Sequence, residues 1–212
     1  MPLDFDLRAA EKALRTADPK LSALIERIGP CCLEPEAGQS PFAALAESIA
    51  YQQLTGKAAA TIFSRVLALY RPKRFPRPQD ILSTEDAALR GAGLSRSKVT
   101  AVKDLAKKTL DGTVPSLTKL RTLDDEEIVR RLTAVRGVGR WTVEMLLIFR
   151  LGRPDVLPAN DYGVQKGFRR AFRTRAHPTP AQVLRRGERW RPYRTVASWY
   201  LWRAADTPNA RA

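Results

Sequence analysis

Helix-type spacing of apolar residues, bounded by clear start and stop signals, constrains the fold of this chain more than any other feature. Between Asp18-Pro19 and Gly29-Pro30, leucines and isoleucines recur at three- and four-residue steps, which places them on one face of a helix. Ser40-Pro41 gives a similar start signal, a capping serine ahead of a proline that the first helical turn tolerates. No run of alternating β-branched residues typical of a strand occurs. The sequence therefore predicts an all-α protein.

The same signals place helices along most of the chain, with a linker at 71–78. The predicted helices cover residues 19–28, 41–52, 55–70, 84–90, 95–110, 124–135, 140–151, 162–172, 180–186 and 193–202. The helix at 124–135 begins with four consecutive acids, which suit the positive end of a helix dipole.

Positive charge is the main compositional signal. The 212 residues contain 37 Lys and Arg against 22 Asp and Glu, a formal net charge of +15. Twelve of these bases lie in residues 163–212, where the only acids are Glu188 and Asp206. Tryptophans and tyrosines are interleaved with them, so we expect a folded basic lobe and not a loose arm. Such a surface favours a polyanionic partner, most commonly nucleic acid, although an unrelated basic enzyme would share the charge.

Several classes of protein are excluded by what the sequence lacks. The N-terminus is acidic at Asp4 and Asp6 and has no signal-peptide pattern, and no stretch of about 18 apolar residues could span a membrane. The only cysteines, Cys31 and Cys32, are adjacent, so they suit neither a disulfide nor a four-thiolate zinc or iron–sulfur site. We therefore expect a cytoplasmic, nucleoid-associated protein with no membrane partner.

The most informative segment is residues 132–144, L-T-A-V-R-G-V-G-R-W-T-V-E. Two glycines, Gly137 and Gly139, separate a helix that ends at 135 from one that begins near 140. Glycines permit positive φ and close approach of a ligand, and amides at the start of the second helix can bind a phosphate. An ordinary corner between helices could also carry Gly-x-Gly. The apolar residues around Gly137 and the basic Arg140 favour the phosphate-binding hairpin.

A second informative segment, residues 155–164, lies shortly beyond the hairpin and reads D-V-L-P-A-N-D-Y-G-V. Pro158 and Asn160 predict a turn, which leaves Asp161 at the start of the next helix. Asp161 could be only an N-cap, the usual role of an aspartate in that position. Its position twenty residues after Trp141 of the hairpin favours a functional carboxylate.

These segments resemble the helix-hairpin-helix–Gly/Pro–Asp superfamily, and within it the 3-methyladenine DNA glycosylase II (AlkA-like) group. Residues 132–144 nearly reproduce that group's L-x-x-(I/V)-x-G-(I/V)-G-R-W-T-A-E hairpin, and 155–161 match its D-V-(F/L)-P-x-x-D segment. Residues 49–59 are similar to its wedge region and 191–202 to its C-terminal helix, so the resemblance spans about residues 40–203. Few residues precede Pro41, so we expect a short form without the group's additional N-terminal α/β domain.

The resemblance implies a two-lobed, all-helical fold with the active site in the cleft between the lobes. Residues 1–47 would be N-terminal helices that pack with the C-terminal lobe, and 48–161 would be the helical domain that contains the hairpin. Residues 162–212 would be the basic C-terminal helices that complete the second lobe.

The resemblance also assigns roles to individual residues. Asp161 would be the catalytic carboxylate, and Gln53 or Leu54 would fill the space that a flipped base leaves. Aromatic side chains would line the base pocket: Trp141, Tyr162 and Trp202. The residues that would contact DNA in the hairpin are Arg136, Gly137, Val138, Gly139, Arg140 and Thr142. No cofactor would be required, although the carbonyls of Thr133, Val135 and Val138 would hold a monovalent cation, Na⁺ or K⁺.

The implied reaction is hydrolysis of the N-glycosidic bond of an alkylated purine of the 3-methyladenine or 7-methylguanine type, in base excision repair of double-stranded DNA. Cleavage builds positive charge on the sugar, which the Asp161 carboxylate would stabilise. A methylated purine is already cationic and needs little acid catalysis, so the lone His177 is expected to be solvated. Trp141 stands where bifunctional members carry a lysine, so we expect no AP-lyase activity. Trp190 and Trp199 are assigned to the core, and the protein is expected to be a monomer.

Two other functions remain open at this point. A non-catalytic helix-hairpin-helix module would bind DNA without needing Asp161 or the aromatic residues. A glycosylase for oxidised or mismatched bases is disfavoured because the hairpin lysine and the cluster cysteines are missing. The sequence does not rank 3-methyladenine, 7-methylguanine, ethenoadenine and hypoxanthine as substrates, because pocket shape decides among them.

Overall fold

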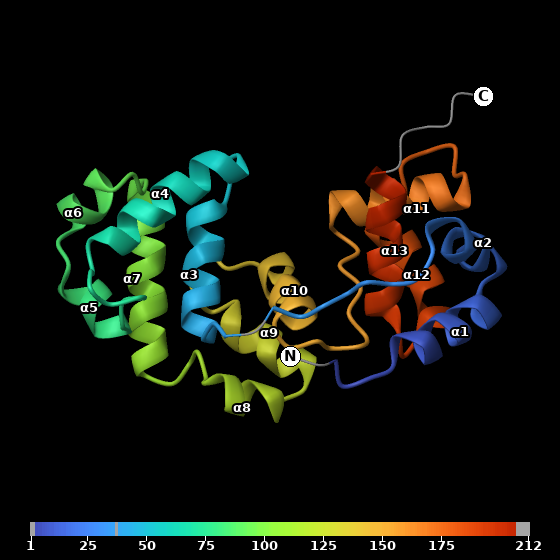
Figure 1. The fold of residues 1–212 in the computed structure, drawn as a ribbon, viewed down its shortest axis with the longest axis horizontal. Helices are drawn as coiled ribbons and strands as arrows, with labels where there is room; N and C mark the ends of the chain where they lie inside the picture. The colour runs from blue at the N-terminus through green and yellow to red at the C-terminus, as the bar shows by residue number, and fades with distance from the viewer. Residues whose placement is uncertain (1–2, 37, 207–212) are drawn as a thin grey trace. The chain divides into compact units, whose positions relative to one another are not determined.

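The computed structural model describes residues 3–36 and 38–206, and their regular structure is helical throughout (Figure 1). In chain order the elements are α1 (Leu7–Ala17), α2 (Pro19–Ile28), α3 (Pro41–Tyr51), α4 (Gly56–Ala68), α5 (Pro78–Ser83), α6 (Asp86–Gly91), α7 (Arg96–Leu110), α8 (Leu117–Arg121), α9 (Asp125–Leu132), α10 (Arg140–Phe149), α11 (Tyr162–Phe172), α12 (Pro180–Gly187), the 3₁₀ helix η1 (Glu188–Trp190) and α13 (Arg194–Asp206). The described residues contain no strand, which confirms the all-α prediction.

Each helix predicted from the sequence is present, and the differences have local causes. The helix predicted for 124–135 is too long, because α9 ends at Leu132 and the next residues form a tight turn in which the Val135 amide donates to the Leu132 carbonyl at 3.1 Å. The sequence analysis missed α1, α5, α8 and η1. The last three are too short to show a helical period, and α1 buries only Ala10 and Leu14.

The described residues form two compact units, 3–36 with 144–206 and 38–143. The sequence placed the boundaries at 47 and 161 instead. Helix α3 belongs to the second unit because it packs on α4 and α7. The segment before Asp161 belongs to the first unit, where the Thr195 amide donates to the Pro154 carbonyl at 3.0 Å.

The first unit is built around α11 and α13, which make its most extensive helix pair (Figure 1). The two backbones touch at Gly167, where a Cβ would lie 1.8 Å from the Leu201 carbonyl oxygen, so no other residue fits there. Helices α1 and α2 also pack on α13. Trp190 and Tyr200 are fully buried in this core, and Trp199 is 9% exposed, as expected for the two tryptophans assigned to packing.

A buried acid joins α2 to α12 and η1. Asp18 caps α2 and is inaccessible to solvent, and it accepts two hydrogen bonds of 2.8 Å from the Arg186 guanidinium and one of 3.1 Å from Trp190 Nε1. Burial opposes the charged carboxylate, but these hydrogen bonds outweigh it and hold the pKa of Asp18 below its ordinary value. Asp18 and Arg186 are thus a structural ion pair.

In the second unit, α3 packs against both α4 and α7, and α5 also packs against α7 (Figure 1). Its core side chains include Leu45 and Ile49 of α3 and Leu105 of α7, each at most 1% exposed. Across the described ranges, none of the helices has the length and apolar character that a membrane crossing requires.

Candidate active site

Asp161 is held in one orientation at the start of α11. Its Oδ1 accepts a hydrogen bond of 2.8 Å from the Val164 amide, the usual geometry of an N-cap. The same oxygen accepts a second hydrogen bond, also of 2.8 Å, from the indole Nε1 of Trp202 on α13. A cap alone needs only the first of these contacts. The second fixes the carboxylate against an aromatic side chain from a different helix.

The approach of Trp202 to Asp161 depends on Gly163, the second residue of α11. A Cβ at Gly163 would lie 2.9 Å from Trp202 Cδ1 and 3.0 Å from Asp161 Oδ1. On its other side the Trp202 ring stacks on Phe149, with centroids 5.7 Å apart and an interplanar angle of 28°. The indole is therefore packed between α10 and α11, and its orientation is fixed before any ligand binds.

The chain leading to Asp161 is tied to the first turn of α13. Thr195 Oγ1 donates to the Arg153 carbonyl at 2.6 Å and accepts from the Val156 amide at 3.0 Å. Asp155 accepts hydrogen bonds from Arg194, including one of 2.7 Å from Nε, and forms an ion pair with Arg191 at 2.5 Å. The sequence analysis gave Asp155 no role; the structure makes it a clamp between this segment and α13, the helix that carries Trp202.

Tyr162 follows Asp161 directly but faces solvent. It is 70% exposed, and its ring stacks on His177 with centroids 5.6 Å apart and an interplanar angle of 21°. His177 is exposed, as expected, and its Nε2 lies 2.8 Å from Gln165 Oε1, whose amide nitrogen donates to the Ala159 carbonyl at 2.8 Å. An exposed aromatic pair thus borders the helix start that carries the carboxylate.

The hairpin between α9 and α10 is held by neighbouring helix α7. Its backbone turns at Gly137, where φ is +78°, and the Arg136 amide donates to Asp104 Oδ2 at 2.7 Å. Lys108 on α7 contacts the same carboxylate at 2.8 Å and also donates to the Ala134 carbonyl. Neither Asp104 nor Lys108 carried a sequence signal, since both occupy ordinary positions on a helix. Together they fix the turn that is expected to meet a phosphate.

The hairpin residues predicted to bind DNA differ in exposure. Gly137 and Gly139 are exposed, and a Cβ at Gly139 would meet no atom of the described residues within 4 Å. Val138 and Thr142 are each 5% exposed, so their side chains pack inward. Arg140 begins α10 and forms an ion pair with Glu126. The open surface of the hairpin is therefore its backbone around the two glycines.

The turn after α3, which holds both wedge candidates, is built as part of the same unit as the hairpin. Gln53 has a left-handed φ of +58° and is exposed, and Leu54 is 41% exposed. The neighbouring Gln52 donates to the Gly137 carbonyl at 2.8 Å. Lys98 on α7 donates to the carbonyls of Ala50 at 2.7 Å and of Gln52 at 2.8 Å.

These contacts join the turn after α3 to the hairpin and fix the position of one relative to the other. Burial lowers the pKa of Lys98, consistent with an ammonium group that is enclosed by the turn. A strongly held turn is what a side chain needs if it is to enter a base stack without folding back. The sequence showed the Gln-Gln-Leu turn but gave no sign that Lys98 supports it.

The remaining pocket and cation candidates lie in both units. Trp202 contacts Asp161 directly, whereas Trp141, on the first turn of α10, is 46% exposed. The Val135 carbonyl accepts a hydrogen bond of 3.1 Å from the Val138 amide, and a carbonyl oxygen has a second lone pair for a cation. No cluster of three or more His, Cys, Asp or Glu side chains suited to a metal occurs in the described ranges.

Comparison with known proteins shows which family the chain resembles. Residues 46–192 match the family described as HhH-GPD superfamily base excision DNA repair protein. The chain is 40% identical over 167 residues to DNA-3-methyladenine glycosylase 1 of Schizosaccharomyces pombe, covering 79% of this chain and 73% of that protein.

Two solved structures are similar over nearly the whole chain. The Schizosaccharomyces pombe 3-methyladenine DNA glycosylase Mag1 in complex with abasic DNA has a TM-score of 0.80 at 37% identity, covering 92% of this chain and 95% of that chain. A DNA-3-methyladenine glycosidase from Bacillus halodurans has a TM-score of 0.86 at 34% identity, covering 93% and 89%. These matches confirm the resemblance expected from the hairpin and Asp161 segments. The chain therefore belongs to the HhH-GPD superfamily of base excision DNA repair proteins.

Proposed function

We propose that this protein is a DNA glycosylase that hydrolyses the N-glycosidic bond of alkylated purines in double-stranded DNA. The observation that carries the proposal is the double hydrogen bond to Asp161 Oδ1, from the Val164 amide and from Trp202 Nε1. A helix cap needs only the first, whereas a positioned carboxylate beside an aromatic wall suits a reaction that develops positive charge. The names of its close relatives, DNA-3-methyladenine glycosylases, support the same class of substrate.

The reaction divides into binding and cleavage. The hairpin backbone around Gly137 and Gly139 binds a phosphate of the DNA backbone, and a side chain of the turn at Gln53 and Leu54 fills the space that the extruded base leaves. The Asp161 carboxylate then stabilises the oxocarbenium-like sugar as the base departs, and water completes the hydrolysis. A purine that methylation has made cationic leaves as a neutral base, so no strong general acid is required.

Trp141 occupies the hairpin position where a lysine nucleophile would be needed for a Schiff base, so the product is an intact abasic strand. The carbonyls of Thr133, Val135 and Val138 would hold a monovalent cation, Na⁺ or K⁺, which would add positive charge at the turn. The enzyme acts as a monomer.

The test is base release from duplexes that each carry one alkylated purine, followed on a denaturing gel with and without hot alkali. We expect release of 3-methyladenine or 7-methylguanine, with strand breaks only after alkali. Strand breaks before alkali, or trapping of a covalent complex with borohydride, would contradict the monofunctional mechanism. Tight DNA binding with no release from any lesion would instead favour the non-catalytic hairpin module.

A further inference from the structure

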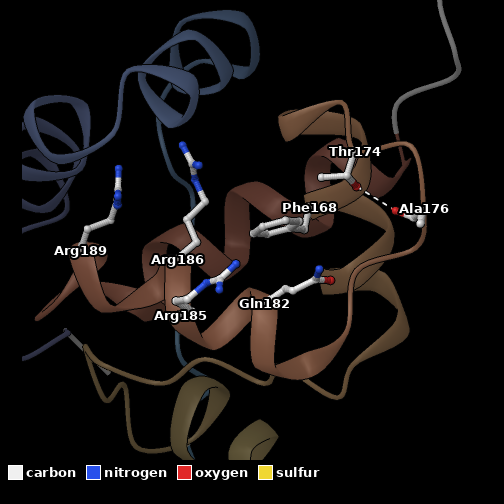
Figure 2. Close-up of a pocket in the computed structure, with 7 residues that line it drawn as sticks. All are labelled: Phe168, Thr174, Ala176, Gln182, Arg185, Arg186 and Arg189. Carbon is white, nitrogen blue, oxygen red and sulfur yellow. Dashed lines mark hydrogen bonds between the residues drawn. The ribbon is translucent and has the colours of Figure 1, made fainter.

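A second basic feature, separate from the hairpin, is a pocket between α11 and α12. It has a volume of about 490 Å³ and is lined by Phe168, Thr174, Ala176, Gln182, Arg185, Arg186 and Arg189. Figure 2 shows Phe168 on one wall, the arginines and Gln182 along α12 and η1, and the Thr174–Ala176 turn facing them. None of these residues contributes to the contacts of Asp161 described above.

Two of the three arginines have no acidic partner among the described residues. No side chain in those ranges forms an ion pair or hydrogen bond with the guanidinium of Arg185 or Arg189, and both side chains are exposed. The nearest acid in sequence, Glu188, is already engaged, at 2.9 Å from Arg191 Nε and 3.5 Å from Arg194. The positive charges of Arg185 and Arg189 are therefore not neutralised by the described part of the chain.

The third arginine is fixed and serves as a rigid wall. The Nε and one terminal nitrogen of Arg186 donate to the Asp18 carboxylate, and its guanidinium carbon lies 4.1 Å from the centroid of the Phe172 ring. Gln182 is fixed too, since its Oε1 accepts from the Thr179 amide at 2.8 Å in a capping box. This bond directs the acceptor end of the amide to the backbone and leaves its NH₂ group as the available end.

The side-chain groups of α12 and η1 that remain available in the pocket, the guanidinium groups of Arg185 and Arg189 and the NH₂ of Gln182, are thus donors. Arg185 lies on α12 and Arg189 on the following η1, and both line the same pocket. Guanidinium groups bind phosphate in a bidentate manner, and the pocket volume is within the range typical of small-ligand sites. A structural role would not need two unpaired arginines beside a fixed third.

We propose that the Arg185–Arg189 pocket binds a phosphate group. The group can come from the backbone of a nucleic acid strand or from a free phosphate-bearing ligand, and both share the chemistry that the pocket recognises. This site goes beyond the proposed glycosylase function, because it is formed by α11, α12 and η1 without the hairpin or Asp161. A strand held here would give the protein a phosphate contact in addition to those of the hairpin.

The test compares Arg185→Gln/Arg189→Gln with a control of equal charge change, Arg8→Gln/Arg27→Gln, on exposed positions of α1 and α2. In the first arm, melting temperature is measured against inorganic phosphate, with sodium chloride at equal ionic strength as the reference. Phosphate should raise the melting temperature of the wild type and the control, because a ligand that binds only the folded state stabilises it. The pocket variant should lose this rise. The single variant Arg185→Gln guards against a folding defect and should show a reduced rise.

The second arm measures the affinity of undamaged duplex DNA against salt concentration by fluorescence anisotropy. If a DNA strand supplies the phosphate, the pocket variant should bind more weakly than the control, and its salt slope should fall by roughly 0.9 for each phosphate that the variant no longer binds. If only the first arm responds, the ligand is a free phosphate compound. If the pocket variant matches the control in both arms, the proposal is wrong. Base excision by the wild type is scored separately, so either proposal can fail alone.

Discussion

Replacement of Gly163 by alanine should separate catalysis from stability. The new Cβ would lie 2.9 Å from Trp202 Cδ1, whereas carbon atoms in contact rest at about 3.5 Å or more, so the indole must move by roughly 0.6 Å. A shift of that size stretches the 2.8 Å hydrogen bond from Trp202 Nε1 to Asp161 to roughly 3.4 Å, beyond the normal range. A hydrogen bond to a charged group contributes about 1.5–3 kcal/mol.

The fold should tolerate this change. Alanine is preferred over glycine in a helix by up to about 1 kcal/mol, which offsets part of the lost hydrogen bond, so the free energy of unfolding should fall by about 1–2 kcal/mol or less. A misplaced carboxylate has a larger effect on the reaction, since an error of about 1 Å in a catalytic group can lower the rate by on the order of 10²-fold. We expect excision to slow by roughly 10- to 100-fold.

The assay is single-turnover excision of a methylated purine at saturating protein, with a melting curve for each variant. The control is Gly91→Ala at the end of α6, where a Cβ would meet nothing within 4 Å, and it should excise at the wild-type rate. Equal rates for Gly163→Ala and Gly91→Ala, with both proteins folded, would refute the idea that Trp202 positions Asp161.

Three further predictions concern other parts of the molecule. Gly139→Ala should weaken binding of all duplexes alike while the melting temperature changes little, because the added methyl meets open space within the protein and only a close ligand would feel it; unchanged affinity by anisotropy would make the hairpin an ordinary corner. Asp18→Asn should lower the free energy of unfolding by about 3 kcal/mol, because it leaves Arg186 without its charged partner. Since the pKa of Asp18 is lowered in the folded state, the stabilisation from its charge is complete above the unfolded pKa of about 4 and disappears as pH falls through the folded pKa. Urea unfolding between pH 3 and 7 should therefore show that acid lowers the free energy of unfolding less in the variant than in the wild type. A thiol reagent should label Cys32 alone in the native protein, because Cys31 is buried and its pKa is raised to about 12 by that burial; fast labelling of two thiols without denaturant would contradict the structure.

The parts of the fold that the sequence predicted are those with strong local signals. Capping residues and proline placed the starts of α2 and α3 correctly, because Asp18 and Ser40 each accept a hydrogen bond from the first turn. The short α5 and α8 were missed because five or six residues do not complete two turns of a periodic pattern, whereas the equally short α6 was predicted with the help of its start signal.

The candidate site was predictable in its reactive group but not in its supports. The hairpin and the Asp161 segment carry a joint motif, and its resemblance to the family singled them out as the predicted site. The contacts that fix them come from residues distant in sequence, such as Trp202 on Asp161 and Lys98 on the Gln52 carbonyl. Nothing in the local sequence around Lys98 distinguishes it from the other polar residues of α7. The arginine pocket also depends on folding, since a run of bases does not reveal which of them lack an acidic partner.

Asp161→Asn tests the central claim most directly. Asparagine keeps the size of the side chain and can still accept the hydrogen bonds from the Val164 amide and from Trp202, so the variant should melt close to the wild type. It removes the negative charge that faces the developing cation, so single-turnover excision of a methylated purine should fall by on the order of 10²–10³-fold, while lesion DNA still binds. If the variant melts normally and excises as fast as the wild type, Asp161 is only a helix cap and the proposed mechanism is wrong.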